Sequence, residues 1–124
     1  MELYLGGFAQ GKLHYVRSKK ADVDYAVVES LPHEDTAKTL IWNQFHLWFR
    51  EELAQQHDPE AQVFKILKQY PQLIIICDEI GNGIVPVEAF EREYRERLGR
   101  CLCILAKEAQ TVERIICGIG CKLK

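Results

Sequence analysis

The sequence predicts an α/β domain built around a mainly parallel β-sheet. Short apolar runs alternate along the chain with longer amphipathic stretches, which is the pattern of β-α-β units. One of these runs, residues 73–77, is apolar at every position, as expected of a strand that is covered on both faces. The chain has 124 residues, so we expect residues 1–124 to form a single domain.

Five short segments are predicted as strands because they are apolar and end at glycine, charged or other turn residues. In chain order they are residues 2–5, 25–28, 73–77, 113–117 and 121–124. We expect the last one to be a short strand at the edge of the sheet, because its two lysines discourage further pairing.

Helices are predicted between these strands. The apolar residues of segment 35–55 recur near helical spacing. A second helix begins at the Asp58-Pro59 start signal and ends before Pro71, and a third begins at Pro86 and carries one apolar stripe. Trp42 and Trp48 would lie on different faces of the first helix, either in the core with partial exposure or at a subunit interface.

The charge balance argues against two classes of partner. The chain carries 16 basic and 18 acidic residues, a formal net charge of -2, so we expect neither nucleic-acid nor membrane binding. The apolar run 73–77 is far shorter than the roughly 20 residues of a spanning helix. The N-terminus has no basic region followed by an apolar one, which indicates a soluble, cytoplasmic protein.

The segment after the first strand carries the most chemical information. It fits the pattern G-x-x-x-x-G-K between a strand and an expected helix, which is the context of a phosphate-binding P-loop. Glycines let backbone N–H groups surround a phosphate, and the lysine neutralises it. A glycine turn without a ligand is the alternative. The residues predicted to hold nucleotide phosphates are Gly6, Gly7, Phe8, Ala9, Gln10, Gly11, Lys12 and Leu13.

Acidic residues at two predicted strand ends are candidates for the second half of such a site. Asp78 and Glu79 follow the run 73–77, and Glu29 follows residues 25–28. The carboxyl ends of parallel strands face the ligand crevice, where a carboxylate can hold Mg²⁺. Each of the three could instead be a solvated or helix-capping carboxylate.

The remaining candidate residues point to structure rather than chemistry. The five cysteines form no convincing metal-ligand spacing and are expected to be reduced thiols. The four histidines share no ligand spacing, so they are expected at the surface or in packing roles. Residues 81–86 form a glycine-containing loop that suits a structural turn as well as a ligand loop.

The run 77–86, CDEIGNGIVP, with the following Arg95-x3-Gly99-Arg100, resembles the adenosylcobinamide kinase/adenosylcobinamide-phosphate guanylyltransferase family. The ending 117–124, CGIGCKLK, is similar to the family's terminal strand and tail, and residues 6–12 resemble its phosphate loop more weakly. The resemblance implies a P-loop NTPase-like, three-layer fold and a role in cobalamin biosynthesis. It implies phosphoryl transfer from ATP or GTP to adenosylcobinamide, with Lys12 and Glu29 in the site, and a homo-oligomer.

The chain departs from the family pattern at points that matter for chemistry. Leu13 replaces the hydroxyl residue that ligates Mg²⁺, and Gln10 stands where the family has a serine. The segment with the nucleotide-accepting histidine is missing, and neither His14 nor His33 is in its context, so guanylyl transfer is not expected. Two hypotheses follow: a nucleotide-dependent kinase with a weakened Mg²⁺ site, or a degenerate nucleotide- or partner-binding relative.

Overall fold

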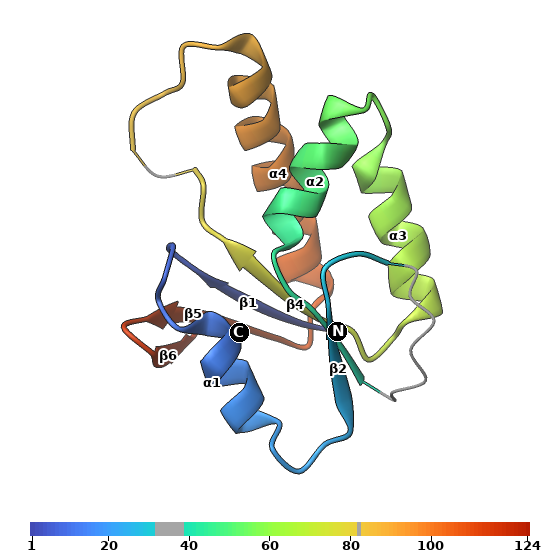
Figure 1. The fold of residues 1–124 in the computed structure, drawn as a ribbon, viewed down its shortest axis with the longest axis vertical. Helices are drawn as coiled ribbons and strands as arrows, with labels where there is room; N and C mark the ends of the chain where they lie inside the picture. The colour runs from blue at the N-terminus through green and yellow to red at the C-terminus, as the bar shows by residue number, and fades with distance from the viewer. Residues whose placement is uncertain (32–38, 82) are drawn as a thin grey trace.

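The structure, a computed structural model, describes residues 1–31, 39–81 and 83–124. Its centre is a six-stranded sheet with the order β2-β3-β4-β1-β5-β6 (Figure 1). The strands are β1 (Glu2–Gly6), β2 (Tyr25–Val28), β3 (Thr39–Trp42), β4 (Ile74–Asp78), β5 (Thr111–Ile116) and β6 (Ile119–Lys122). All neighbouring strands pair in parallel except β5 and β6, which are antiparallel. The predicted mainly parallel sheet with a C-terminal edge strand is therefore confirmed.

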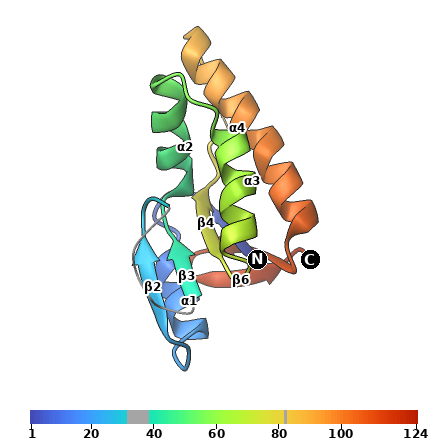
Figure 2. The same cartoon turned by 90° about the vertical axis from the view of Figure 1, so that its right-hand side faces the viewer.

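Helices cover both faces of this sheet, as Figures 1 and 2 show. They are α1 (Lys12–Lys19), α2 (Phe45–Ala54), α3 (Pro59–Gln69) and α4 (Ala89–Glu108). Alternation along the strands separates two cores: Leu3 and Ile75 belong to the cluster under α2, α3 and α4, whereas Tyr4 and Ile76 pack with Val16 of α1. The three-layer α/β architecture is thus confirmed.

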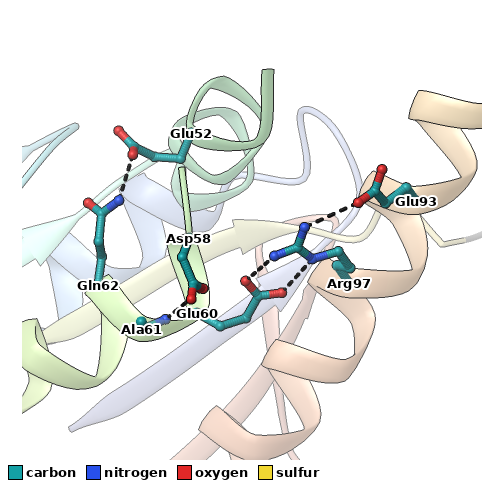
Figure 3. A network of polar contacts seen from close by, with 7 residues as sticks. All are labelled: Glu52, Asp58, Glu60, Ala61, Gln62, Glu93 and Arg97. Carbon is teal, nitrogen blue, oxygen red and sulfur yellow. Dashed lines mark hydrogen bonds and ion pairs between the residues drawn. The ribbon is translucent and has the colours of Figure 1, made fainter. Parts of the chain in front are cut away.

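The helix after the Asp58-Pro59 signal begins where the sequence predicts. The Asp58 side chain accepts a hydrogen bond of 3.2 Å from the Ala61 N–H, and Pro59 occupies the first turn (Figure 3). The next helix starts slightly later than predicted, at Ala89 instead of Pro86. No helix in the described part of the chain has both the length and the apolar character to cross a membrane.

The predicted helix over residues 35–55 is wrong over residues 39–42. Residues 35–38 lie outside the described residues, and Thr39–Trp42 form strand β3 instead. Helix α2 begins only at Phe45. Leu40 and Trp42 face one core and Ile41 the other, so the strand is apolar on both sides. Such a short continuous run carries no periodicity that distinguishes a strand from a helix.

The two tryptophans therefore do not share a helix. Trp42 is fully buried in β3 and Trp48 is half-buried on α2, and their ring centroids lie 4.7 Å apart with an edge-on orientation. Phe45 packs edge-on against Trp42 at 4.9 Å. These contacts place both tryptophans against the larger core, with partial exposure of one. An additional role at a subunit interface stays a prediction.

Candidate functional site

The predicted phosphate loop connects the central strand β1 to α1, and two of its glycines are structurally required. A Cβ on Gly6 would lie 2.6 Å from the carbonyl oxygen of Ile115, so no larger residue fits there. Gly11 has φ of +82° and forms the N-cap of α1. The loop therefore passes closely over the sheet and delivers the next residue, Lys12, at the start of the helix.

Lys12 points back into the loop and is buried. Only 8% of its surface is exposed. Its Nζ donates to the carbonyl oxygen of Gly7 at 2.7 Å and lies 2.7 Å from Oδ1 of Asp78. Asp78 ends β4, directly beside Gly6 in the sheet register. The structure thus brings together the predicted phosphate-binding lysine and one of the predicted acidic residues.

His46, in the first turn of α2, is a third member of this cluster. Its Nδ1 accepts the backbone N–H of Asp78 at 3.2 Å, and its Nε2 lies 3.5 Å from Oδ2 of the same aspartate. Burial lowers the pKa of His46 below its ordinary value, although the neighbouring aspartate opposes this. The imidazole is therefore neutral at pH 7, with its proton on Nε2 facing the carboxylate.

The backbone around His46 is anchored to the long helix α4. The hydroxyl of Tyr94 donates to the carbonyl oxygen of His46 at 2.7 Å, and burial raises the pKa of this hydroxyl. Gln44, the N-cap of α2, has φ of +59°, so the chain turns sharply between β3 and α2. This turn and the α4 contact hold the start of α2 against the end of β4.

A cavity of about 230 Å³ lies beside the loop. It is lined by residues 8–14, by Asn43 and Gln44 at the β3–α2 junction, and by Asp78. Lys12, whose ammonium is buried, and the N-terminus of α1 are both at the loop side of this cavity, which suits it to an anion. His46 is not among the lining residues, so it reaches the cavity only through Asp78.

Leu13 lines the same cavity but also packs against the core on the α1 side of the sheet. Its side chain therefore has a packing role, and it offers no oxygen to a metal ion. In the described part of the chain, no group of three or more His, Cys, Asp or Glu side chains is arranged to hold a metal. Any magnesium at this cavity would be held jointly with phosphate oxygens and water.

Glu79 points away from this cavity. Its two carboxylate oxygens accept hydrogen bonds of 2.7 and 2.9 Å from Arg114, a two-pronged ion pair. Glu79 and Arg114 line a separate cavity of about 400 Å³ against α4. Asp78 and Glu79, adjacent in the sequence, are thus on different sides of the sheet end.

Glu29 is exposed at the end of β2, the strand at the opposite edge from the β5–β6 hairpin. Strands β3 and β4 separate β2 from β1, which is about 14 Å at three strand spacings. The structure therefore does not bring Glu29 next to Lys12, and its contact with a nucleotide stays a prediction.

The cysteines agree with the prediction of free thiols. All five are unpaired with one another in the structure. On α4, Cys101 is buried and Cys103 is exposed, as their separation by two residues predicts. Burial raises the pKa of Cys77 and of Cys101, so these two thiols are unreactive at neutral pH.

Sequence reasoning missed three residues of this site: His46, Asn43 and Gln44. A sequence signal for Asn43 and Gln44 was present, because these two polar residues directly follow the apolar run 39–42, as polar residues commonly follow a strand. No sequence signal marks His46, since its partner is 32 residues away and meets it only through the packing of α2 on β4.

Comparisons with known proteins agree with the resemblance. The family model described as cobinamide kinase / cobinamide phosphate guanyltransferase matches residues 11–123. The curated "Bifunctional adenosylcobalamin biosynthesis protein CobU" of Escherichia coli (strain K12) is 36% identical to this chain over 53 residues. The protein of the same name from Salmonella typhimurium (strain LT2) shows the same identity over the same length. Each alignment covers 43% of this chain and only 29% of the relative.

The family model and the curated relatives match different lengths of the sequence. The curated relatives are aligned over less than a third of their own length, so they do not transfer a complete activity. The family model, by contrast, extends from the last glycine of the phosphate loop through β6. Because it covers most of the sequence, the chain belongs to the cobinamide kinase / cobinamide phosphate guanyltransferase family.

Proposed function

We propose that this protein binds ATP or GTP at the cavity beside Lys12 and transfers the terminal phosphoryl group to the aminopropanol hydroxyl of adenosylcobinamide. The observation that carries the proposal is the buried Lys12 ammonium, held 2.7 Å from Asp78 at the mouth of a glycine-rich loop. Family membership supports the identity of the acceptor. Phosphoryl transfer needs mainly positioning and charge stabilisation, which these groups supply.

Lys12 and Asp78 change partners in this mechanism. The loop N–H groups and the Lys12 ammonium bind the phosphates, so the ion pair between Lys12 and Asp78 opens as the anion enters. Asp78 is then released toward the cavity, where it orients the acceptor hydroxyl or, directly or through water, a magnesium ion. Bound Mg²⁺ would neutralise charge on the phosphate oxygens. Asp78 and the amide oxygens of Asn43 and Gln44 fit such an ion, whereas Leu13 contributes nothing to it.

Asp78 is assigned this role in preference to the two other acidic candidates. Glu79 is paired with Arg114 of β5 at the separate cavity against α4, and Glu29 lies three strands from the loop. His46 is assigned a positioning role, because its Nδ1 is already used by the backbone of Asp78 and its ring is buried. It therefore does not replace the nucleotide-accepting histidine that the family resemblance implies, and guanylyl transfer is not part of the proposal.

The test is equilibrium binding of ATP and GTP with and without Mg²⁺, combined with detection of phosphorylated adenosylcobinamide by mass spectrometry. We expect binding by the unmodified protein and at least a tenfold loss in Lys12→Ala, since a buried charge contact to phosphate disappears. Lys65→Ala, at an exposed position on α3, is the matched control. No binding at millimolar nucleotide, or equal binding by Lys12→Ala, would contradict the proposal.

A second variant separates binding from catalysis. His46→Gln removes the imidazole that fixes Asp78 but leaves the loop and Lys12 in place. We expect the rate of transfer to fall at least tenfold while nucleotide affinity changes less than threefold, because only the carboxylate loses its orientation. Separate measurement of kcat and of the nucleotide Kd resolves this split, and an equal loss in both would rule out a specific positioning role.

The packing of Leu13 favours a second candidate function, a nucleotide-binding relative without catalysis. A leucine that contacts the core cannot turn to a metal ion. In that case nucleotide binds in a manner that depends on Lys12, but no phosphorylated product forms even at high protein concentration. The binding and product measurements above distinguish the two candidates directly.

A further inference from the structure

The tip of the phosphate loop is attached to the hairpin between β5 and β6. The Gln10 side-chain oxygen accepts the backbone N–H of Cys117 at 2.7 Å, and the Gln10 carbonyl oxygen accepts the N–H of Gly118 at 2.8 Å. The two loops also approach closely, because a Cβ on Gly11 would lie 3.5 Å from the Cα of Gly118. One residue of the loop therefore bridges to a segment more than 100 residues later.

The geometry of the hairpin explains why these two N–H groups are available. Ile116 pairs with Ile119, so Cys117 and Gly118 are the two turn residues, with φ of +50° and +75°. Positive φ at both positions is the signature of a type I′ turn. In such a turn the N–H groups of the two central residues are not used by the strand ladder, and Gln10 satisfies both of them.

The loop needs such an external attachment. Gly6, Gly7 and Gly11 give it a large backbone entropy in the absence of contacts. Within the loop, the Gln10 amide nitrogen donates to the carbonyl oxygen of Phe8 at 3.4 Å, and the Lys12 ammonium donates to that of Gly7 at 2.7 Å. The bonds from Gln10 to the hairpin therefore hold the loop in an open shape around the cavity before any ligand arrives. A preformed loop binds an anion more tightly than one that must be ordered on binding.

We propose that Gln10 is a positioning residue that locks the phosphate loop onto the β5–β6 turn and thereby raises the affinity of the site for a polyphosphate. This inference rests on the proposed nucleotide-binding function of the same loop. Gln10 acts through the backbone conformation of the loop and does not contact the reacting atoms.

The test uses Gln10→Met, which keeps the side-chain length but removes the acceptor oxygen. Gln55→Met is the control, because the Gln55 side chain donates to Glu51 within its own helix end and lies outside the cavity lining. Two quantities are measured on the full chain: the Kd for inorganic triphosphate, and hydrogen exchange of the backbone amide of Cys117. We expect Gln10→Met to weaken triphosphate binding about three- to tenfold and to accelerate exchange at Cys117, as loss of one hydrogen bond predicts.

The outcomes separate this inference from the function on which it rests. If the unmodified protein binds triphosphate and Gln10→Met binds it equally well, the positioning role is overturned while the proposed function stands. Unchanged exchange at Cys117 would show that the bond does not form, which also overturns the inference. Absence of triphosphate binding by the unmodified protein would remove the proposed function and this inference together. An equal loss of affinity in Gln55→Met would show a nonspecific effect and count against Gln10.

Discussion

The two faces of the sheet are built differently. The face under α2, α3 and α4 is covered by a large cluster in which Trp42, Phe45 and Phe49 are completely buried. On the other face, α1 is the one helix in the described part of the chain, and its cluster is much smaller. There, ion pairs of Lys19 with Glu113 and of Lys20 with Glu2 extend the contact between helix and sheet.

This difference shows how the site is supported. The face under α2, α3 and α4, here called the thick face, holds the first turn of α2, and with it His46, in a fixed position against Asp78. The opposite face, covered by α1 and here called the thin face, carries the phosphate loop. The loop and α1 must accommodate an arriving anion. Local stability is commonly lower where fewer apolar contacts are made, and ligand-binding segments are often found there. The following experiments compare the two faces directly, from the largest expected effect to the smallest.

The largest difference is expected between Ile75→Ala and Ile76→Ala. These neighbours on β4 are 0% and 1% exposed and point to the thick and the thin face respectively. We expect Ile75→Ala to lower the free energy of unfolding by about 4 kcal/mol and Ile76→Ala by about 2 kcal/mol. The reason is that α1 can move to fill part of the space left by the Ile76 side chain, whereas three packed helices cannot move into the space left by Ile75. Urea unfolding followed by circular dichroism measures both, and an equal or reversed order would refute the comparison.

The next effect concerns the polar contacts of the thin face. Glu113 is 6% exposed, and its carboxylate accepts hydrogen bonds from Lys19 and, at 2.7 Å, from Tyr15. Burial alone would raise the pKa of Glu113, but these bonds outweigh it and hold the pKa below the ordinary value of 4.5. We expect Glu113→Gln to lower the free energy of unfolding by about 1 kcal/mol at pH 7, since Lys19 is partly exposed and finds water instead.

The same carboxylate has a defined pH dependence. A carboxyl group with a depressed pKa in the folded state stabilises the protein fully above its unfolded pKa, near 4.5, and loses this contribution as the pH falls through the lower, folded value. The loss of stability between pH 5 and pH 3 should therefore be shallower in Glu113→Gln than in the unmodified protein. Glu96→Gln, at an exposed ion pair on α4, is the control.

The smallest effect is expected at the polar network that ties the helices of the thick face together (Figure 3). Arg97 of α4 donates two hydrogen bonds, of 2.8 and 2.6 Å, to Glu60 of α3, and lies 3.2 Å from Glu93. The Arg97 guanidinium holds the pKa of Glu60 below its ordinary value. Because both partners are 27% exposed, we expect Glu60→Gln to cost about 0.5 kcal/mol, and less in 1 M salt. A loss equal to that in Ile75→Ala would show that the polar network, and not the apolar cluster, holds α3 to α4.

The sequence determined the parts of this protein whose signals are local. The strand, glycine loop and lysine of residues 2–12 are contiguous, and the cap at Asp58 and the apolar run 73–77 carry their own patterns. These elements were predictable because the signal for each is contained in neighbouring residues. The family resemblance of residues 77–86 is likewise contained in one contiguous segment. Strand β3 was not, since four apolar residues show no period.

Only the tertiary structure decided which residues share the site. Lys12, His46 and Asp78 come from three separate elements, and they meet because β4 lies beside β1 while α2 packs on the end of β4. Glu29 ends a parallel strand just as Asp78 does, yet strand order places it at the far edge of the sheet. Strand order and helix packing depend on contacts between distant segments. Hydrophobic periodicity records only which face of an element is buried, so it does not specify these neighbours.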